Sequence, residues 1–317
     1  MIKSILITGG SGLVGKNFME HSETKNYTIF SPSHAEVDLL EFEQINNFLK
    51  EKKPDLIIHA AGIVGGIQAN IKNPVKFLIQ NTDMGKNLLL AAKKQNVKRL
   101  INLSSSCVYP KNYNKPLNEE LILSGELEPT NEAYAIGKIF IQKLCSYINS
   151  ENNSFLYKTL IPCNLFGRFD NFDLKTGHLL PSIINKIHSA KKNDSKEVHV
   201  WGDGSVRREF MYAADLADFL FYCIKNFETI PSTLNVGIGR DYSVLDYYMA
   251  VAKSLSWKGE FVFDLSKPVG QKQKTVSIEK LKKTGWHSST SLDKAIRLTI
   301  KYFVEENYNV LQISFSF

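Results

Sequence analysis

A glycine-rich turn near the start of the chain constrains the fold more than any other feature of the sequence. Residues 3–8 form a short apolar run, and glycines follow at Gly9, Gly12 and Gly15 before a helical pattern begins. Glycine fits where a turn is tight and where the backbone must approach a pyrophosphate closely. The N–H groups and the dipole of the next helix then favour the negative charge. At the first strand-to-helix junction of a chain, the pattern predicts a dinucleotide site formed by Gly9, Gly10, Ser11, Gly12, Leu13, Val14 and Gly15.

Short apolar strands and helical patterns alternate through the first half of the chain. After the glycine turn we expect strands at about 27–31, 55–59, 98–103 and 155–161, with helices between them. This alternation predicts an α/β fold of the Rossmann type, a doubly wound parallel sheet with helices on both faces.

The pattern becomes shorter and less regular after about residue 165. We therefore expect an NADP-binding Rossmann domain at 1–165, with returning segments near 210–240, and a smaller C-terminal α/β substrate lobe at 166–317. The apolar end of the chain, 309–317, has no clear role and fits either an edge strand or a loose tail.

Tyr134 and Lys138 are four residues apart, so on a helix both side chains leave the same face. An ammonium beside a phenol favours the phenolate, and we expect Lys138 to lower the pKa of Tyr134. Tyr134 could then exchange a proton with a substrate oxygen near neutral pH. An ordinary amphipathic helix can carry the same spacing, so the pair gains meaning only from the rest of the chain.

The end of the second strand should show which dinucleotide is bound. An acidic residue there would bind the ribose of NAD, and an arginine would accept the 2′-phosphate of NADP. Residues 31–34 offer neither, which favours NADP slightly, although a plain polar loop is an equally good interpretation. We expect Asp38 near the adenine, and Ala60, Ala61 and Gly62 to let the backbone pass closely under the cofactor.

Composition excludes several classes of protein. The formal charge of +7 comes mostly from isolated lysines, whereas a nucleic-acid binder would concentrate its charge in a patch with aromatic residues. No apolar run is long enough to span a membrane, and the start of the chain reads as a strand and not as a signal peptide. The four cysteines form no close metal-type pair, so we expect a reduced, cytoplasmic protein without a metal site.

Several stretches considered together resemble one enzyme family. Besides the glycine turn they are His59-Ala60-Ala61, Val64-Gly65-Gly66-Ile67, Ser105-Ser106-Cys107-Val108-Tyr109-Pro110, residues 127–138, Asn164-Leu165-Phe166-Gly167, residues 170–172, 200–202, 208–210 and 266–268. Over nearly its whole length the chain resembles the extended short-chain dehydrogenase/reductase family, and within it the GDP-L-fucose synthase group. The stretches at 64–67 and 128–132 are specific to that group.

The resemblance implies an NADPH-dependent enzyme that epimerises C3 and C5 of a GDP-linked 4-keto-6-deoxy sugar and then reduces C4. By position, Tyr134 protonates the C4 oxygen as hydride arrives, and Lys138 tunes Tyr134 and binds the nicotinamide ribose. Ser105 hydrogen-bonds the carbonyl, and Cys107 and His178 match the epimerisation pair.

The resemblance also implies which other residues contact the two ligands. For the cofactor these are Leu103, Ser104, Pro162, Asn164, Leu165 and His178. For the GDP-sugar they are Ser106, Cys107, Asn164, Lys186, Trp201, Arg208 and Lys274. It further implies a homodimer formed through the long helices near 74–95 and 134–150.

Three departures from the group's pattern leave the sugar open. Lys186 stands where the group commonly has arginine, Val269 replaces an aspartate, and Gln273 replaces one member of a basic pair. A GDP-6-deoxy-4-keto-heptose is therefore a competing substrate. The same residues are compatible with a C4 reductase that acts after a separate epimerase, with an NAD-dependent nucleotide-sugar epimerase or dehydratase, and with a dinucleotide-sensing protein without catalysis.

Overall fold

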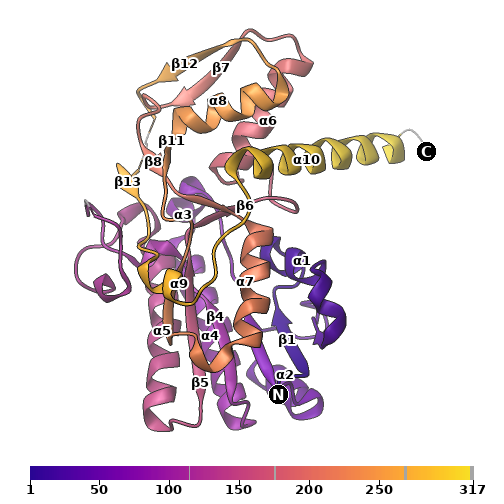
Figure 1. The fold of residues 1–317 in the computed structure, drawn as a ribbon, viewed down its shortest axis with the longest axis vertical. Coiled ribbons are helices and arrows are strands. Elements are labelled where there is room, and N and C mark those ends of the chain that lie inside the picture. The colour runs from indigo at the N-terminus through magenta and orange to yellow at the C-terminus, as the bar shows by residue number, and fades with distance from the viewer. Residues whose placement is uncertain (114, 175, 268–269, 315–317) are drawn as a thin grey trace.

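A six-stranded parallel sheet forms the larger part of the molecule (Figure 1). The computed structural model describes residues 1–113, 115–174, 176–267 and 270–314, with side chains through residue 306. The strand order is β10-β5-β4-β3-β1-β2, and every neighbouring pair is parallel. The strands are β1 (Ser4–Thr8), β2 (Thr28–Phe30), β3 (Leu56–His59), β4 (Arg99–Leu103), β5 (Leu156–Pro162) and β10 (Thr233–Val236). The prediction of a doubly wound parallel sheet is confirmed.

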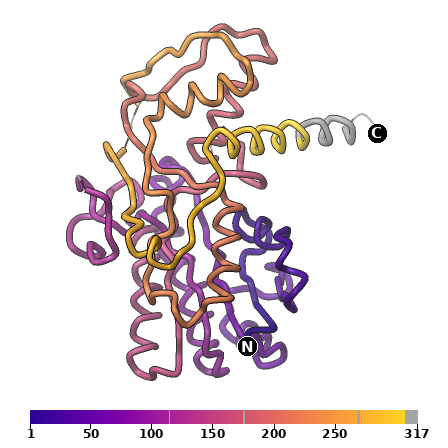
Figure 2. Tube along the Cα trace, viewed as in Figure 1, coloured from indigo at the N-terminus to yellow at the C-terminus, as the bar shows by residue number. Residues whose placement is uncertain are grey.

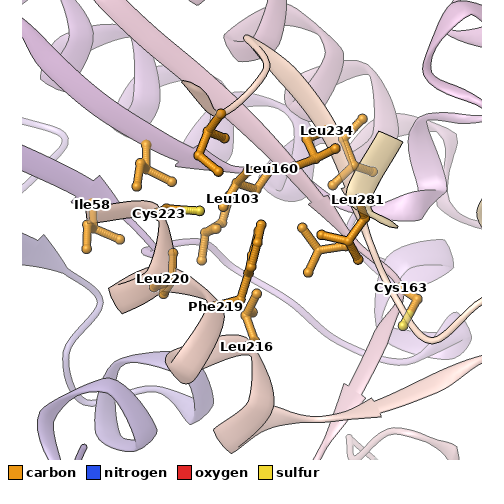
Figure 3. Packing of buried hydrophobic residues seen from close by; sticks show 14 of the residues in the cluster. Ile58, Leu103, Leu160, Cys163, Leu216, Phe219, Leu220, Cys223, Leu234 and Leu281 are labelled. Atoms are coloured by element: carbon orange, nitrogen blue, oxygen red, sulfur yellow. The ribbon is translucent and has the colours of Figure 1, made fainter. Parts of the chain in front are cut away.

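Helices cover both faces of this sheet because successive strand residues point to opposite sides. Ile5 and Ile7 of β1 belong to one apolar cluster with the helix residue Phe219, whereas Leu6 between them belongs to another with Ile141. Figure 3 shows the first cluster, in which leucines from three strands surround Phe219. Both faces of the sheet are therefore buried under apolar side chains, as a parallel sheet requires. The covering helices are α1 (Leu13–Met19), α2 (Phe42–Lys52), α4 (Pro74–Lys94), α5 (Glu132–Glu151) and α7 (Ala213–Lys225).

A smaller lobe lies beyond the carboxyl ends of the strands, with its own apolar core (Figures 1 and 2). Its elements are α6 (Leu179–Lys192), β7 (Glu197–Trp201), β8 (Arg207–Arg208), β11 (Tyr242–Ser243), α8 (Val244–Leu255), β12 (Glu260–Asp264), β13 (Gln273–Lys274) and α10 (Leu292–Ser314). The parallel pair β6 (Asn164–Phe166) and β9 (Phe210–Tyr212) lies between this lobe and the sheet. The expected division at 165/166 stays a prediction.

The remaining elements are short. They are α3 (Ile67–Lys72), α9 (Glu279–Lys283) and the 3-10 turns η1 (Ser22–Asn26), η2 (Ser106–Val108), η3 (Glu119–Leu121), η4 (Pro129–Asn131) and η5 (Phe227–Thr229). Within the ranges described, no helix combines the length and the apolarity needed to cross a bilayer.

One expectation about the end of the chain is wrong. Residues 309–314 belong to helix α10 and form neither an edge strand nor a loose tail. A helix already under way adds each further residue more easily than a new element forms, and this favours continuation of α10. Residues 315–317 lie outside the described part of the chain.

Candidate active site

The glycine turn lies at the carboxyl end of β1, where β2 is on one side and β3 on the other. This is the point at which the order of the parallel strands reverses, and such sheets bind their ligands there. Gly9 has a φ of +73°, and a Cβ added to it would lie 2.7 Å from the backbone nitrogen of Ala61. A Cβ on Gly15 would lie 2.3 Å from the Gly9 carbonyl oxygen. The turn is therefore a backbone cradle that any side chain would fill, which fits the close approach of a pyrophosphate.

The loop after β2 carries hydroxyls and two acids, and one of the hydroxyls lies against this turn. A Cβ on Gly10 would lie 1.9 Å from Ser31 Oγ, so the Ser31 hydroxyl is directly against the turn. Ser33 donates from its N–H and its hydroxyl to Glu36 at 2.7 and 2.8 Å. The exposed His34 lies 3.6 Å from Asp38, whose carboxylate also accepts the N–H of Leu40. The expected place of Asp38 near adenine stays a prediction.

Lys138 joins the ends of two strands. Helix α5 begins at Glu132, so Tyr134 and Lys138 lie one turn apart in its first two turns, as the spacing predicts. Lys138 Nζ donates to the carbonyl oxygen of Leu103 at 3.1 Å, and a Cβ on Gly62 would lie 3.4 Å from the same nitrogen. The ammonium is therefore held between the loop that follows β3 and the last residue of β4.

The expected lowering of the Tyr134 pKa by Lys138 is wrong. Lys138 Nζ lies 5.7 Å from the centre of the Tyr134 ring, over its face. Burial raises the pKa of Tyr134, nearby Cys107 raises it further, and a hydrogen bond from Ser105 offsets only part of this rise. Burial also lowers the pKa of Lys138 to about 8. Desolvation dominates both groups because they lie deep in the site.

Ser105 links the phenol and the thiol. It follows β4 and caps the turn η2, where its Oγ accepts the N–H of Cys107 at 3.4 Å. Its hydroxyl also lowers the pKa of both Tyr134 and Cys107, so it lies beside both side chains. Burial raises the pKa of Cys107, while Lys274, Ser105 and Lys138 act in the opposite direction. The structure therefore brings five of the expected residues together: Ser105, Cys107, Tyr134, Lys138 and Lys274.

Ser104 and Ser106 are buried beside this cluster. Among the described residues, Ser104 Oγ is buried without a hydrogen-bond partner. A buried hydroxyl without a partner is costly in a folded protein unless a ligand or a water satisfies it. This atom is at the end of β4, where the resemblance implies cofactor contact.

His178 comes from the segment that leads into the small lobe. It is the residue before α6, and its carbonyl oxygen accepts the N–H of Ser182. Burial lowers the pKa of His178, so its neutral form prevails near pH 7. A Cβ on Gly66 would lie 3.4 Å from the Gly177 oxygen, so this segment packs against the loop after β3. Asn81, which sequence reasoning did not identify, holds that same loop through hydrogen bonds in both directions with the backbone of Ile63.

The predicted substrate residues of the small lobe form two pairs. Lys186 Nζ lies 5.8 Å from the centre of the Trp201 ring and donates to the carbonyl oxygen of His199 at 3.2 Å. Arg208 and Lys274 are directly opposite each other on the paired strands β8 and β13. Burial lowers the pKa of Lys274 to about 8.

Glu128 is a second residue that the sequence did not identify. Burial lowers the pKa values of both Arg208 and Lys274, and the negative charge of Glu128 opposes this shift in both, so Glu128 faces this cationic pair. Thr130 fixes its carboxylate by donating from its N–H and its hydroxyl at 3.4 and 3.2 Å. The available signal was its position in the group-specific stretch 128–132.

The last expected cofactor residues follow β5. Pro162 ends that strand, and Asn164 and Leu165 begin β6. The side chain of Asn164 donates from Nδ2 to the backbone carbonyl oxygen of Glu209 at 2.8 Å. Val269 lies outside the described residues. In the part of the chain that is described, no group of three or more His, Cys, Asp or Glu side chains could hold a metal ion.

Comparison with known proteins identifies the family. A model described as "NAD dependent epimerase/dehydratase family" matches residues 5–237. GDP-L-colitose synthase of Yersinia pseudotuberculosis is 52% identical over 305 residues, covering 96% of this chain and 99% of that protein. GDP-L-fucose synthase of Azorhizobium caulinodans is 46% identical over 305 residues, with 96% and 97% covered.

Solved structures agree with these relatives. A GDP-6-OMe-4-keto-L-xylo-heptose reductase from C. jejuni has a TM-score of 0.89 at 26% identity, covering 96% of this chain and 99% of that one. A GDP-mannoheptose C4 reductase from Campylobacter jejuni with NADP bound has a TM-score of 0.86 at 27% identity, with 96% and 98% covered. The chain therefore belongs to the NAD dependent epimerase/dehydratase family, as a GDP-L-fucose synthase-like member of the extended short-chain dehydrogenases/reductases.

Proposed function

We propose that this protein reduces the C4 ketone of a GDP-linked 4-keto-6-deoxy sugar with NADPH, after epimerising C3 and C5 in the same site. The observation that carries the proposal is the cluster of Ser105, Cys107, Tyr134 and Lys138 beside the glycine cradle, in which Cys107 and Lys138 are buried and Ser105 and Tyr134 are half-buried. The names of the relatives, fucose and colitose synthases, support this chemistry.

The residues present fit a nicotinamide dinucleotide. The cradle at 9–15 would hold the pyrophosphate, Lys138 and the unpartnered Ser104 hydroxyl would hold the nicotinamide half, and Ser31 would contact the adenosine half. When bound, the reduced nicotinamide supplies a hydride. A solved neighbour that holds NADP supports NADP(H) over NAD.

Tyr134 is the acid of the reduction. Because burial raises its pKa, the phenol keeps its proton at neutral pH and can give it to the C4 oxygen. Ser105 donates a hydrogen bond to the same oxygen, where negative charge develops. Lys138 positions the ribose and stabilises the phenolate that remains after the transfer.

Cys107 and His178 carry the epimerisation. A thiolate can remove the proton next to a ketone when the resulting enolate is stabilised, here by Tyr134 and Ser105. His178 returns a proton to the opposite face of the ring. Its lowered pKa makes the imidazolium a stronger acid, although this form is less populated near pH 7.

The substrate we propose is a deoxyhexose, with GDP bound by Lys186, Trp201, Arg208 and Lys274. The relatives that are 52% and 46% identical are named for deoxyhexose products, whereas the heptose reductases are 26–27% identical. Arginine and lysine suit the diphosphate, and the half-exposed Trp201 ring suits the base or ribose.

We further propose a homodimer that works in the cytoplasm. Helices α4 and α5 pack side by side (Figure 1), and both expose apolar side chains that a second copy would cover. These are Val75, Ile79, Leu90, Ile136, Phe140 and Tyr147. All four cysteines are unpaired and buried, which suits a reducing compartment.

The direct test is turnover of GDP-4-keto-6-deoxymannose with NADPH. We expect NADPH to be consumed, and deuterium from heavy water to enter at C3 and C5. Consumption without deuterium would indicate a C4 reductase that acts after a separate epimerase. No turnover with this sugar or a heptose analogue, together with tightly bound NAD in the purified protein, would instead indicate an NAD-dependent epimerase or dehydratase.

A further inference from the structure

The carboxylate of Glu209 joins three segments that are far apart in the sequence. The side chain is completely buried, between β8 and β9. Its Oε1 accepts the N–H groups of Ile238 and Gly239 at 2.7 and 2.8 Å, and its Oε2 accepts that of Val276 at 2.8 Å. A Cβ on Gly237 would lie 2.4 Å from Oε1, so there is room only for a glycine where the chain passes this carboxylate. Glu209 thereby ties the loop after β10 and the segment after β13 to β8.

Asp241 makes a second junction in the same place. Arg207 Nε donates to its Oδ1 at 2.7 Å, and Gln273 Nε2 donates to its Oδ2 at 2.6 Å. The hydroxyl of Thr275 also donates to Oδ2. Burial raises the pKa of Asp241, but these three hydrogen bonds outweigh it and leave the pKa below its usual value. Asp241 is therefore an ionised carboxylate with its donors in place.

Residues that bind Glu209 or Asp241 flank both Arg208 and Lys274, the two cations proposed to bind the diphosphate. Arg208 lies between Arg207, held by Asp241, and Glu209 itself. Lys274 lies between Gln273 and Thr275, which both donate to Asp241. The next residue, Val276, donates its N–H to Glu209.

The two cations need such support because they repel each other. Arg208 and Lys274 are directly opposite each other on β8 and β13, and the charge of Arg208 adds to the lowering of the Lys274 pKa that burial causes. Each of these strands has only two residues, so backbone pairing alone fixes them weakly.

We infer that Glu209 and Asp241 form a carboxylate clamp that sets the spacing of Arg208 and Lys274 and so positions them for the diphosphate of the nucleotide sugar. The inference rests on the proposed function of this site. Neither carboxylate touches substrate in this scheme, so both are positioning residues. Removing either would move the cations, and a misaligned charge-assisted hydrogen bond to phosphate weakens binding about tenfold or more.

The test compares Glu209→Gln and Asp241→Asn with Asp215→Asn. Asp215 is a matched control because it is also buried and accepts hydrogen bonds from Ser288 and Thr290, yet these bonds join α7 to residues 288–290 and not to β8 or β13. We expect all three variants to lower the free energy of unfolding. Only the first two should raise the Kd for GDP and the KM for the GDP-sugar by about tenfold or more, with the NADPH Kd within about twofold and kcat within about threefold. Thr275→Val, which removes one donor to Asp241, gives a milder version if Asp241→Asn fails to fold.

Equal weakening of GDP binding in Asp215→Asn, or no weakening in the clamp variants, would overturn the inference while leaving the enzyme function intact. A wild-type protein that neither binds GDP nor reduces the ketone would instead refute the proposed function. In that case the clamp can still be tested without substrate. The measurement is the rate at which the Lys274 amine is acylated, followed by peptide mass spectrometry. The clamp predicts faster labelling of Lys274 in Glu209→Gln and Asp241→Asn than in Asp215→Asn, and equal rates would contradict it.

Discussion

Gly15→Ala should damage the cofactor cradle, and the structure sets the size of the effect. The added methyl would lie 2.3 Å from the Gly9 oxygen and 2.4 Å from the Gly10 Cα, about 1.1 Å inside the 3.4 Å of an ordinary contact. Both neighbours are backbone atoms, so the turn itself must shift. Overpacking of this kind costs up to about 3 kcal/mol. The higher helix propensity of alanine offsets about 1 kcal/mol of this cost, because Gly15 lies within helix α1. The net loss in the free energy of unfolding is then about 2 kcal/mol.

The matched control for this prediction is Gly12→Ala. Gly12 has a φ of −82°, and its added methyl would lie 3.4 Å from its nearest neighbour, the Gly9 oxygen. We therefore expect a change in unfolding free energy within about 1 kcal/mol for the ligand-free control.

Urea unfolding followed by tryptophan fluorescence gives the stabilities, and NADPH titration gives the affinities. Gly15→Ala should also raise the NADPH Kd by about tenfold or more, because the shifted backbone is the predicted pyrophosphate cradle. A Gly15→Ala protein as stable as wild type and equally tight for NADPH would refute the packing described for this turn.

Three further predictions concern the catalytic cluster and the assembly. Lys274→Met should raise the free energy of unfolding by about 1–3 kcal/mol below pH 8, because burial lowers the Lys274 pKa to about 8 and the folded state holds the charge at a cost. As pH rises above 8, the folded lysine loses its proton before the unfolded one, so the gain should vanish by about pH 10.5; a gain independent of pH in urea unfolding would contradict this. Cys107→Ser should stop deuterium uptake at C3 and C5 and still reduce an already epimerised ketone, and uptake at the wild-type rate would show that another base acts. Phe140→Lys should yield a monomer by light scattering, since it adds a charge to the exposed apolar face of α4 and α5; a persisting dimer would place the interface elsewhere.

The sheet and its long helices could be predicted from the sequence because their signals are local. The apolar run before Gly9 and the helical pattern of 74–95 correspond to β1 and α4 within about one residue. The Tyr134–Lys138 spacing also required only a helix, and α5 supplies it.

The chemistry of the site was harder to predict because it depends on burial. The sequence indicates that Lys138 follows Tyr134 by one turn, but not that both are desolvated. Burial therefore reversed the expected direction of the Tyr134 pKa shift. The raised value suits the reduction, because an acid must hold its proton until hydride arrives.

The carboxylate clamp was beyond reach of the sequence for a different reason. Asp241 and Thr275 are far apart in the chain, and they meet through two-residue strands with no periodic signal. Glu128 is similar, since its role depends on facing Arg208 and Lys274 from a separate segment. Contacts between distant short segments need the structure, whereas strands and helices do not.

Tyr134→Phe tests most directly whether the Tyr134 phenol protonates the C4 oxygen. Single-turnover NADPH oxidation with GDP-4-keto-6-deoxymannose should slow by about 100-fold to 10,000-fold, as expected when a general acid is removed. NADPH should bind to Tyr134→Phe as tightly as to wild type, because Lys138 still donates to the Leu103 oxygen and the glycine cradle is unchanged. Reduction at close to the wild-type rate, with the cofactor bound normally, would show that the Tyr134 phenol is not the acid.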